Sequence, residues 1–165
     1  MQQLTSQDRV HVLIIDDSLY SRARSKTVEL LAKVYDHVDH RFVKGFRLLT
    51  LGWSDGNSFI PLGFSLLSSQ KKENRLVDGS ATIDKRCNGY KRRVEATGKA
   101  TDVLIRLLQQ AKDYGFTAKY VLFYSWFAFP SVLVKVTKVG FHSVAMVKNT
   151  PKIFYMMNCK MKCAT

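Results

Sequence analysis

Two strand-like segments on either side of a four-residue turn constrain the fold of this chain most strongly. Residues 42–53 and 58–67 are rich in aromatic and aliphatic side chains, and Ser54-Asp55-Gly56-Asn57 between them is a strong turn signal. A connection this short makes the two strands antiparallel neighbours. Pro61 has no N–H to donate to a sheet ladder, so we expect it at an edge or a bulge. The sequence therefore predicts a hairpin over residues 42–67.

The segments around this hairpin alternate between strand and helix patterns. Nearly continuous hydrophobicity over residues 10–16 predicts a strand that is buried on both faces. Apolar residues at helical spacing predict three helices, over 26–38, from Thr101 to Gly115, and over 127–136 with Pro130 in the first turn and Gly140 after the end. Short apolar segments predict further strands, over 120–123, 141–148 and 153–157, the last two forming a hairpin around 149–151. Strands followed by alternating helices and strands indicate an α/β fold with a mixed, helix-covered sheet.

The charge of the chain indicates a polyanionic partner. Its 165 residues suffice for one domain, and 26 Lys and Arg against 13 Asp and Glu give a net charge of +13. A soluble domain of this size usually carries a charge of magnitude roughly 2–8. Residues 68–99 are polar and without periodicity, so we expect a long exposed loop there. Its basic residues have the composition of a phosphate-binding surface, and they are Lys71, Lys72, Arg75, Lys85, Arg86, Lys91, Arg92, Arg93 and Lys99.

Two short polar or aromatic segments follow predicted strands. Asp16 and Asp17 come at the expected carboxyl end of the first strand, where α/β sheets place their sites and where a carboxylate can bind Mg²⁺. The alternative is that these residues only cap a turn. Tyr124 begins the aromatic segment after strand 120–123, in which we expect Trp126 and Phe127 to pack in the core.

Membrane and secretion signals are not found in the sequence. No apolar segment reaches the roughly 18 residues of a membrane span, and the first residues lack the basic and apolar parts of a signal peptide. We therefore expect a cytosolic protein. Cys87, Cys159 and Cys163 form no Cys-x-x-Cys pair, so we expect free thiols rather than a zinc site.

The segments described so far resemble a known family. The order and spacing of residues 12–18, 25–32, 35–37, 45–56, 84–86, 91–93, 99–101 and 120–123 are similar to those of the catalytic domain of bacterial insertion-sequence transposases of the DDE type. The resemblance covers residues 10–157, nearly the whole chain. It implies a ribonuclease-H-like fold, in which a three-strand meander precedes alternating helices and strands. It also implies a bacterial cytosolic protein with DNA as its partner.

The resemblance further implies a two-metal site. Members use two Asp and one Glu to hold two Mg²⁺ or Mn²⁺ ions for DNA cleavage and strand transfer. The first Asp matches Asp16, in an Asp-x-Ser pattern with Ser18, and Asp17 is the alternative if the register differs by one residue. The second Asp falls at position 124, where this chain has Tyr124. The family Glu lies on a helix beyond the sheet, and the chain stops at Thr165, so we expect one partial domain over 1–165, incomplete at its C-terminus.

Three functional hypotheses remain open at this point. The first is a transposase catalytic domain that has become inactive, because Tyr124 replaces a metal ligand. The second is a retained DNA-binding or inhibitory module, which binds DNA, a full-length transposase or a second copy of itself. The third is a generic basic RNA-binding domain with Phe42, Phe46 and Phe59 exposed on one sheet face.

Overall fold

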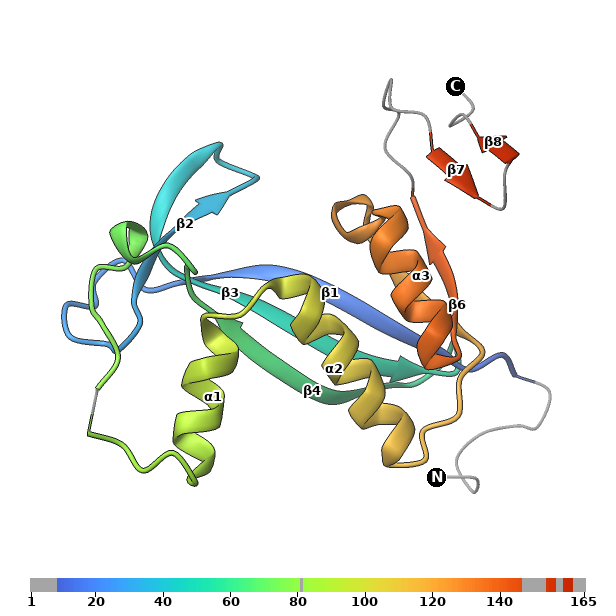
Figure 1. Ribbon diagram of the computed structural model, residues 1–165, viewed down its shortest axis with the longest axis horizontal. Helices are drawn as coiled ribbons and strands as arrows, with labels where there is room; N and C mark the ends of the chain where they lie inside the picture. Colours follow the sequence, from blue (N-terminus) through green and yellow to red (C-terminus); the bar gives the residue numbers. More distant parts are fainter. Residues whose placement is uncertain (1–8, 81, 147–153, 157–158, 162–165) are drawn as a thin grey trace.

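A six-stranded mixed sheet forms the centre of the protein (Figure 1). The computed structural model describes residues 9–80 and 82–146, together with the backbone of 154–156 and 159–161. The sheet has the order β2-β3-β1-β5-β6, and β4 also pairs with β3. Its strands are β1 (Val12–Ser21), β2 (Ala32–Asp36), β3 (Arg41–Ser54), β4 (Phe59–Leu67), β5 (Tyr120–Phe123) and β6 (His142–Ala145). Two further strands, β7 (Phe154–Met156) and β8 (Cys159–Met161), pair with each other in an antiparallel ladder.

The strand order confirms the predicted ribonuclease-H-like fold. Strands β1, β3 and β4 form the antiparallel meander, and β5 and β6 then add in parallel on the other side of β1. The helices between and after these strands are α1 (Asn88–Ala96), α2 (Ala100–Asp113) and α3 (Pro130–Val139). Strand β2 is an addition to the predicted order, and Figure 1 shows the β2–β3 hairpin rising away from the rest of the sheet.

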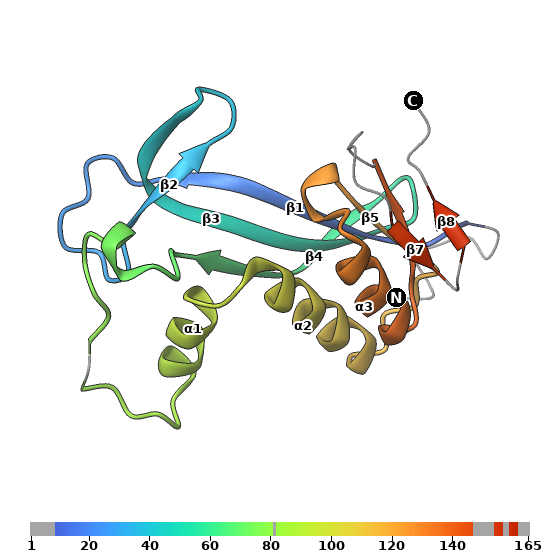
Figure 2. The same cartoon turned by 45° about the horizontal axis from the view of Figure 1, so that its top comes forward.

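The helices α2 and α3 pack against the same face of the sheet (Figure 2). On β1, Leu13 and Ile15 are at most 1% exposed, whereas Val12 and Ile14 on the opposite face are half-buried. We call these the covered face and the open face. The prediction that this strand is buried on both faces is therefore wrong, because α2 and α3 cover only one of them.

The predicted hairpin is confirmed, with β3 and β4 joined by the turn at Asp55. The ladder shifts register between Leu51 and Gly52, so one extra residue of β4 bulges out directly after Pro61. Pro61 thus lies at a bulge, as predicted, where its missing N–H costs little. On the other side of β3, a Cβ atom on Gly45 would lie 2.3 Å from the backbone oxygen of Tyr20, so only glycine allows β1 to approach this closely.

The helix predicted over 26–38 is wrong. Residues 22–31 form an irregular segment in which Leu30 has a positive φ of 58°, and β2 follows. Within β2 the buried residues alternate, so Ala32 and Val34 face inward and pair with β3. The apolar residues whose spacing suggested a helix are divided between the irregular segment and β2. Pairing with β3 makes the second part of this stretch a strand.

The later elements agree more closely with the sequence. Helix α2 has the predicted position, and β5 has the predicted bounds. Helix α3 begins at Pro130 instead of 127, because Ser125–Phe127 forms a separate 3-10 turn, η2. Gly140 ends α3 in the left-handed conformation, with φ of 108°. Strands β6 and β7 lie within the two predicted C-terminal strands, and the hairpin expected around 149–151 lies outside the described residues.

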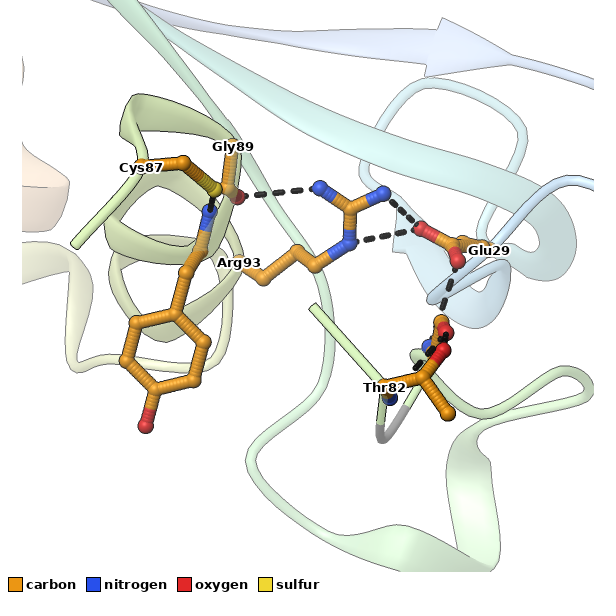
Figure 3. A network of polar contacts seen from close by, with 7 residues as sticks. Glu29, Thr82, Cys87, Gly89 and Arg93 are labelled. Carbon is orange, nitrogen blue, oxygen red and sulfur yellow. Dashed lines mark hydrogen bonds and ion pairs between the residues drawn. The ribbon is translucent and has the colours of Figure 1, made fainter. Parts of the chain in front are cut away.

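The segment predicted as one basic loop is partly helical. A short 3-10 turn, η1 (Lys72–Asn74), lies near its start, and α1 occupies 88–96. The Cys87 sulfur accepts a hydrogen bond from the Tyr90 N–H and so caps the first turn of α1 (Figure 3). Cys87 is a free, exposed thiol, as predicted. No helix in the described part of the chain is long and apolar enough to cross a membrane.

Candidate functional site

The two adjacent acidic residues of β1 lie on opposite faces of the sheet. The sequence placed them at the end of the strand, but β1 continues to Ser21, so both are within it. Side chains alternate along a strand, so Asp17 shares the covered face with Leu13 and Ile15, and Asp16 shares the open face with Ile14. The parallel pairing with β5 ends at Ile14, so both carboxylates lie just beyond the sheet's parallel part.

Asp17 forms an ion pair with Arg47 of β3. The Arg47 Nε atom donates to Asp17 Oδ1 at 3.1 Å, and a second contact joins Nη2 to Oδ2. The Asp17 side chain is 9% exposed and that of Arg47 is 27% exposed, and this burial lowers the pKa of the guanidinium. The guanidinium also lies 5.5 Å from the centre of the Trp126 ring. Asp17 is therefore engaged in holding β1 and β3 together, which favours Asp16 over Asp17 as the site residue.

Asp16 lies level with Tyr124 across the parallel pair of strands. The register pairs Val12 with Tyr120 and Ile14 with Leu122, where the ladder ends, and counting two more residues along each chain sets Asp16 level with Tyr124. Tyr124 has an extended backbone directly after β5 and is 68% exposed. Asp16 is half-buried, and one carboxylate oxygen accepts a hydrogen bond from the Ser18 hydroxyl. The register thus directs the two positions that the sequence singled out to the same end of the sheet's parallel part.

The donor atoms at this position do not fit a pair of divalent metal ions. Mg²⁺ sites in proteins use carboxylate and carbonyl oxygens, and a two-metal centre needs several carboxylates. Asp16 supplies one carboxylate, Asp17 is paired with Arg47, and Tyr124 has a phenol in place of a carboxylate. Across the described residues, no group of three His, Cys, Asp or Glu side chains could hold a metal ion.

The aromatic segment after β5 is divided between core and surface. Phe127 is 2% exposed, so its predicted core position is confirmed, whereas the same prediction for Trp126 is wrong because that ring is 41% exposed. The Trp126 ring lies 4.9 Å from the ring of His37, which follows β2. The tip of the β2–β3 hairpin therefore reaches across to the segment that follows Tyr124.

Many of the predicted phosphate-binding residues already form ion pairs. Arg92 pairs with Glu95, and Arg93 pairs with Glu29, as Figure 3 shows for the second pair. Lys71, Arg75 and Arg86 also have acidic partners, which are Glu73, Asp78 and Asp84. The remaining four form no ion pair with a described carboxylate, and they are Lys72, Lys85, Lys91 and Lys99.

A basic groove lies between α1 and α2. It has a volume of about 570 Å³ and its cationic residues are Lys85, Lys91, Arg92 and Arg106. Glu95, whose side chain is 7% exposed, accepts hydrogen bonds from both arginines. We call this the α1–α2 groove. The sequence reasoning missed Arg106, although its place between the apolar positions of α2 would have put it on the exposed side of that helix.

The aromatic row that the RNA-binding hypothesis required is not formed. Phe42 and Phe59 are 67% and 59% exposed, but Phe46 is only 6% exposed. Phe46 packs with Leu30, Leu31 and Ala96 in a second, smaller core.

The meander and the parallel strands beyond it define a ribonuclease-H-like domain. The chain belongs to the DDE superfamily endonucleases, since the model of that family matches residues 1–156. This membership confirms the DDE-type transposase resemblance, and the family acts on DNA with divalent metal ions. Comparisons with curated proteins and with solved structures find no match.

Proposed function

We propose that this chain is a DDE-family domain that binds DNA but does not cleave it. The observation that carries the proposal is the register of β1 and β5, which sets Tyr124 level with Asp16, and the family resemblance places a second Asp at position 124. Tyr124 offers a phenol where the family uses a carboxylate, and Mg²⁺ sites in proteins are built from carboxylate and carbonyl oxygens. A single carboxylate at Asp16 does not neutralise two divalent cations. Tyr124 thus disables metal-dependent cleavage and leaves the fold intact.

The charge of the chain supports DNA binding. Its net charge is +13, and the α1–α2 groove presents Lys85 and Lys91 without acidic partners among the described residues. Lysines of this kind contact phosphates and release counterions, which gives affinity without reading sequence. Arg92 and Arg106 also line the groove, although Glu95 neutralises part of their charge.

Salt dependence tests the DNA-binding part of the proposal. We expect binding of a fluorescent duplex, followed by anisotropy, to weaken steeply as NaCl is raised. The double variant Lys85→Ala, Lys91→Ala should lower the slope of log K against log[salt] by about 2, since each phosphate contact contributes about 0.9. The double variant Lys33→Ala, Lys44→Ala is the matched control. These two exposed lysines lie opposite each other in the β2–β3 ladder, outside the groove. Equal slopes for the two double variants would contradict the role of the groove.

A nicking assay tests the absence of cleavage. Supercoiled DNA that carries the terminal repeats of a related insertion sequence is incubated with the purified chain and Mg²⁺ or Mn²⁺. We expect no nicked product above that of the Asp16→Asn variant. Nicking that requires the metal and is lost in Asp16→Asn would contradict the proposal.

A further inference from the structure

A second cavity opens on the open face, at the end of β1 away from β5. Its volume is about 450 Å³, and it lies between β1, β3, β4 and the side of α1. We call it the Tyr20 pocket, and its principal residues are Tyr20, Arg22, Phe46, Phe64, Arg92 and Arg93. None of the residues assigned by the family resemblance to metal binding lines it.

The Tyr20 pocket combines exposed aromatic rings with cations. Phe64 is 57% exposed and Tyr20 is 39% exposed, while Phe46 is almost fully buried. The Arg22 guanidinium lies 5.3 Å from the centre of the Tyr20 ring, and Arg92 donates to the backbone oxygen of Phe64 at 3.2 Å. A guanidinium therefore lies over the Tyr20 ring, and another is hydrogen-bonded to the backbone of Phe64. Aromatic rings that stack on bases, with cations on the neighbouring phosphates, are how proteins bind single-stranded nucleic acid.

One wall of the pocket is held by a network of polar contacts (Figure 3). Arg93 Nε donates to Glu29 at 2.6 Å, and its Nη1 donates to the Gly89 backbone oxygen at 3.0 Å. Glu29 also accepts from the Ser80 N–H at 3.2 Å. This network joins α1 to the segment before β2, so the wall is set before any ligand binds. Binding to such a preformed site loses little conformational entropy.

The pocket and Asp16 lie on the same face of the sheet. Asp16 pairs with Thr50, and Thr50 pairs with Phe64, so these three residues form one row across β1, β3 and β4. Strands are about 4.8 Å apart, which places Phe64 about 10 Å from Asp16. Tyr20 is four residues beyond Asp16 on the same side of β1, about 14 Å at 3.4 Å per residue. A DNA strand that passes Asp16 therefore reaches the pocket within about four nucleotides.

We propose that the Tyr20 pocket binds unpaired DNA, with one base stacked on Phe64 and another base of the same strand stacked on Tyr20, while Arg22 and Arg92 contact the flanking phosphates. This inference rests on the proposed function and adds the form of DNA that is preferred. Duplex DNA buries its base faces in the stack and offers only phosphates to the pocket. The chain should therefore bind a duplex with a single-stranded overhang more tightly than a blunt duplex.

The test compares two fluorescent DNAs of the same duplex length, one blunt and one with a six-nucleotide overhang. Stacking on a ring adds to the affinity for an unpaired base, so we expect the overhang to bind about tenfold more tightly. Phe64→Ala should reduce this ratio at least about threefold and leave blunt-duplex affinity unchanged. Phe59→Ala is the matched control, because Phe59 is an equally exposed ring of β4 that covers Gly52 outside the pocket, and it should keep the preference.

Arg22→Gln is a second variant, and it leaves both rings in place. Circular dichroism checks that every variant is folded. We expect Arg22→Gln to weaken overhang binding more than blunt-duplex binding. A wild-type chain that binds both DNAs equally, or a folded Phe64→Ala variant that keeps the preference, would overturn the pocket assignment. Those results would leave duplex binding by the α1–α2 groove standing. Overhang binding without any duplex binding would instead contradict the groove and support the pocket.

Discussion

The same substitution at the two adjacent acidic residues of β1 should destabilise the chain to very different extents. Asp17→Asn leaves the Arg47 guanidinium without its carboxylate, whereas Asp16→Asn removes only a partner of the Ser18 hydroxyl. Breaking a fully buried ion pair costs about 3–5 kcal/mol. Because 27% of the Arg47 side chain is exposed, water stabilises part of the unpaired charge, and we expect a loss of about 2 kcal/mol. Asp16→Asn should change the free energy of unfolding by less than about 0.5 kcal/mol.

Urea unfolding followed by circular dichroism measures this difference. At about 2–4 °C per kcal/mol for a chain of this size, Asp17→Asn should also lower Tm by about 4–8 °C. The double variant Asp17→Asn, Arg47→Met should recover part of the loss, because no unpaired charge remains. If Asp16→Asn destabilises the chain as much as Asp17→Asn, the assignment of Asp17 to structure and Asp16 to the site is refuted.

Three further substitutions test other parts of the account. Gly45→Ala should cost about 1–3 kcal/mol in urea unfolding, because its Cβ would overlap the backbone of Tyr20, and an unchanged midpoint would contradict that close approach. Leu108→Ala, in the middle of the core on α2, should cost about 3–5 kcal/mol in the same assay. The Ser58 N–H donates to Asp55 and holds the pKa of that carboxylate below its usual range, so its stabilising effect is present above about pH 4 and is lost as the pH falls through the lowered pKa. Asp55→Asn should therefore make stability less dependent on pH below about 5, and an unchanged acid dependence would count against this contact.

The parts of the fold that depend on local pattern were predictable from the sequence. The turn at 54–57 lies between two strands that need no distant partner to be identified, and Gly115 and Gly140 end helices whose apolar spacing is regular. By contrast, β2 exists because it pairs with β3, and no local pattern distinguishes it from a short helix. The irregular segment before β2 could not be predicted for the same reason, because it depends on where β2 pairs with β3.

The candidate site was predictable only in part. The sequence identifies Asp16 and Tyr124, but their proximity depends on the parallel register of β1 and β5. The sequence does not separate Asp16 from Asp17, because that requires knowing which face α2 and α3 cover. The Tyr20 pocket was missed for a similar reason. Its rings come from three strands and its arginines from two other segments, so only the assembled fold brings them together.

The most direct test of the central claim is a calorimetric titration of Mn²⁺ into four forms of the chain. They are the wild type, Tyr124→Phe, Tyr124→Asp, and Tyr124→Asp combined with Asp16→Asn. The account predicts that only Tyr124→Asp binds the ion, because it alone places two carboxylates side by side across β1 and β5. Mn²⁺ binding by the wild type as tight as that of Tyr124→Asp would show that Tyr124 does not disable the site, and would contradict the account.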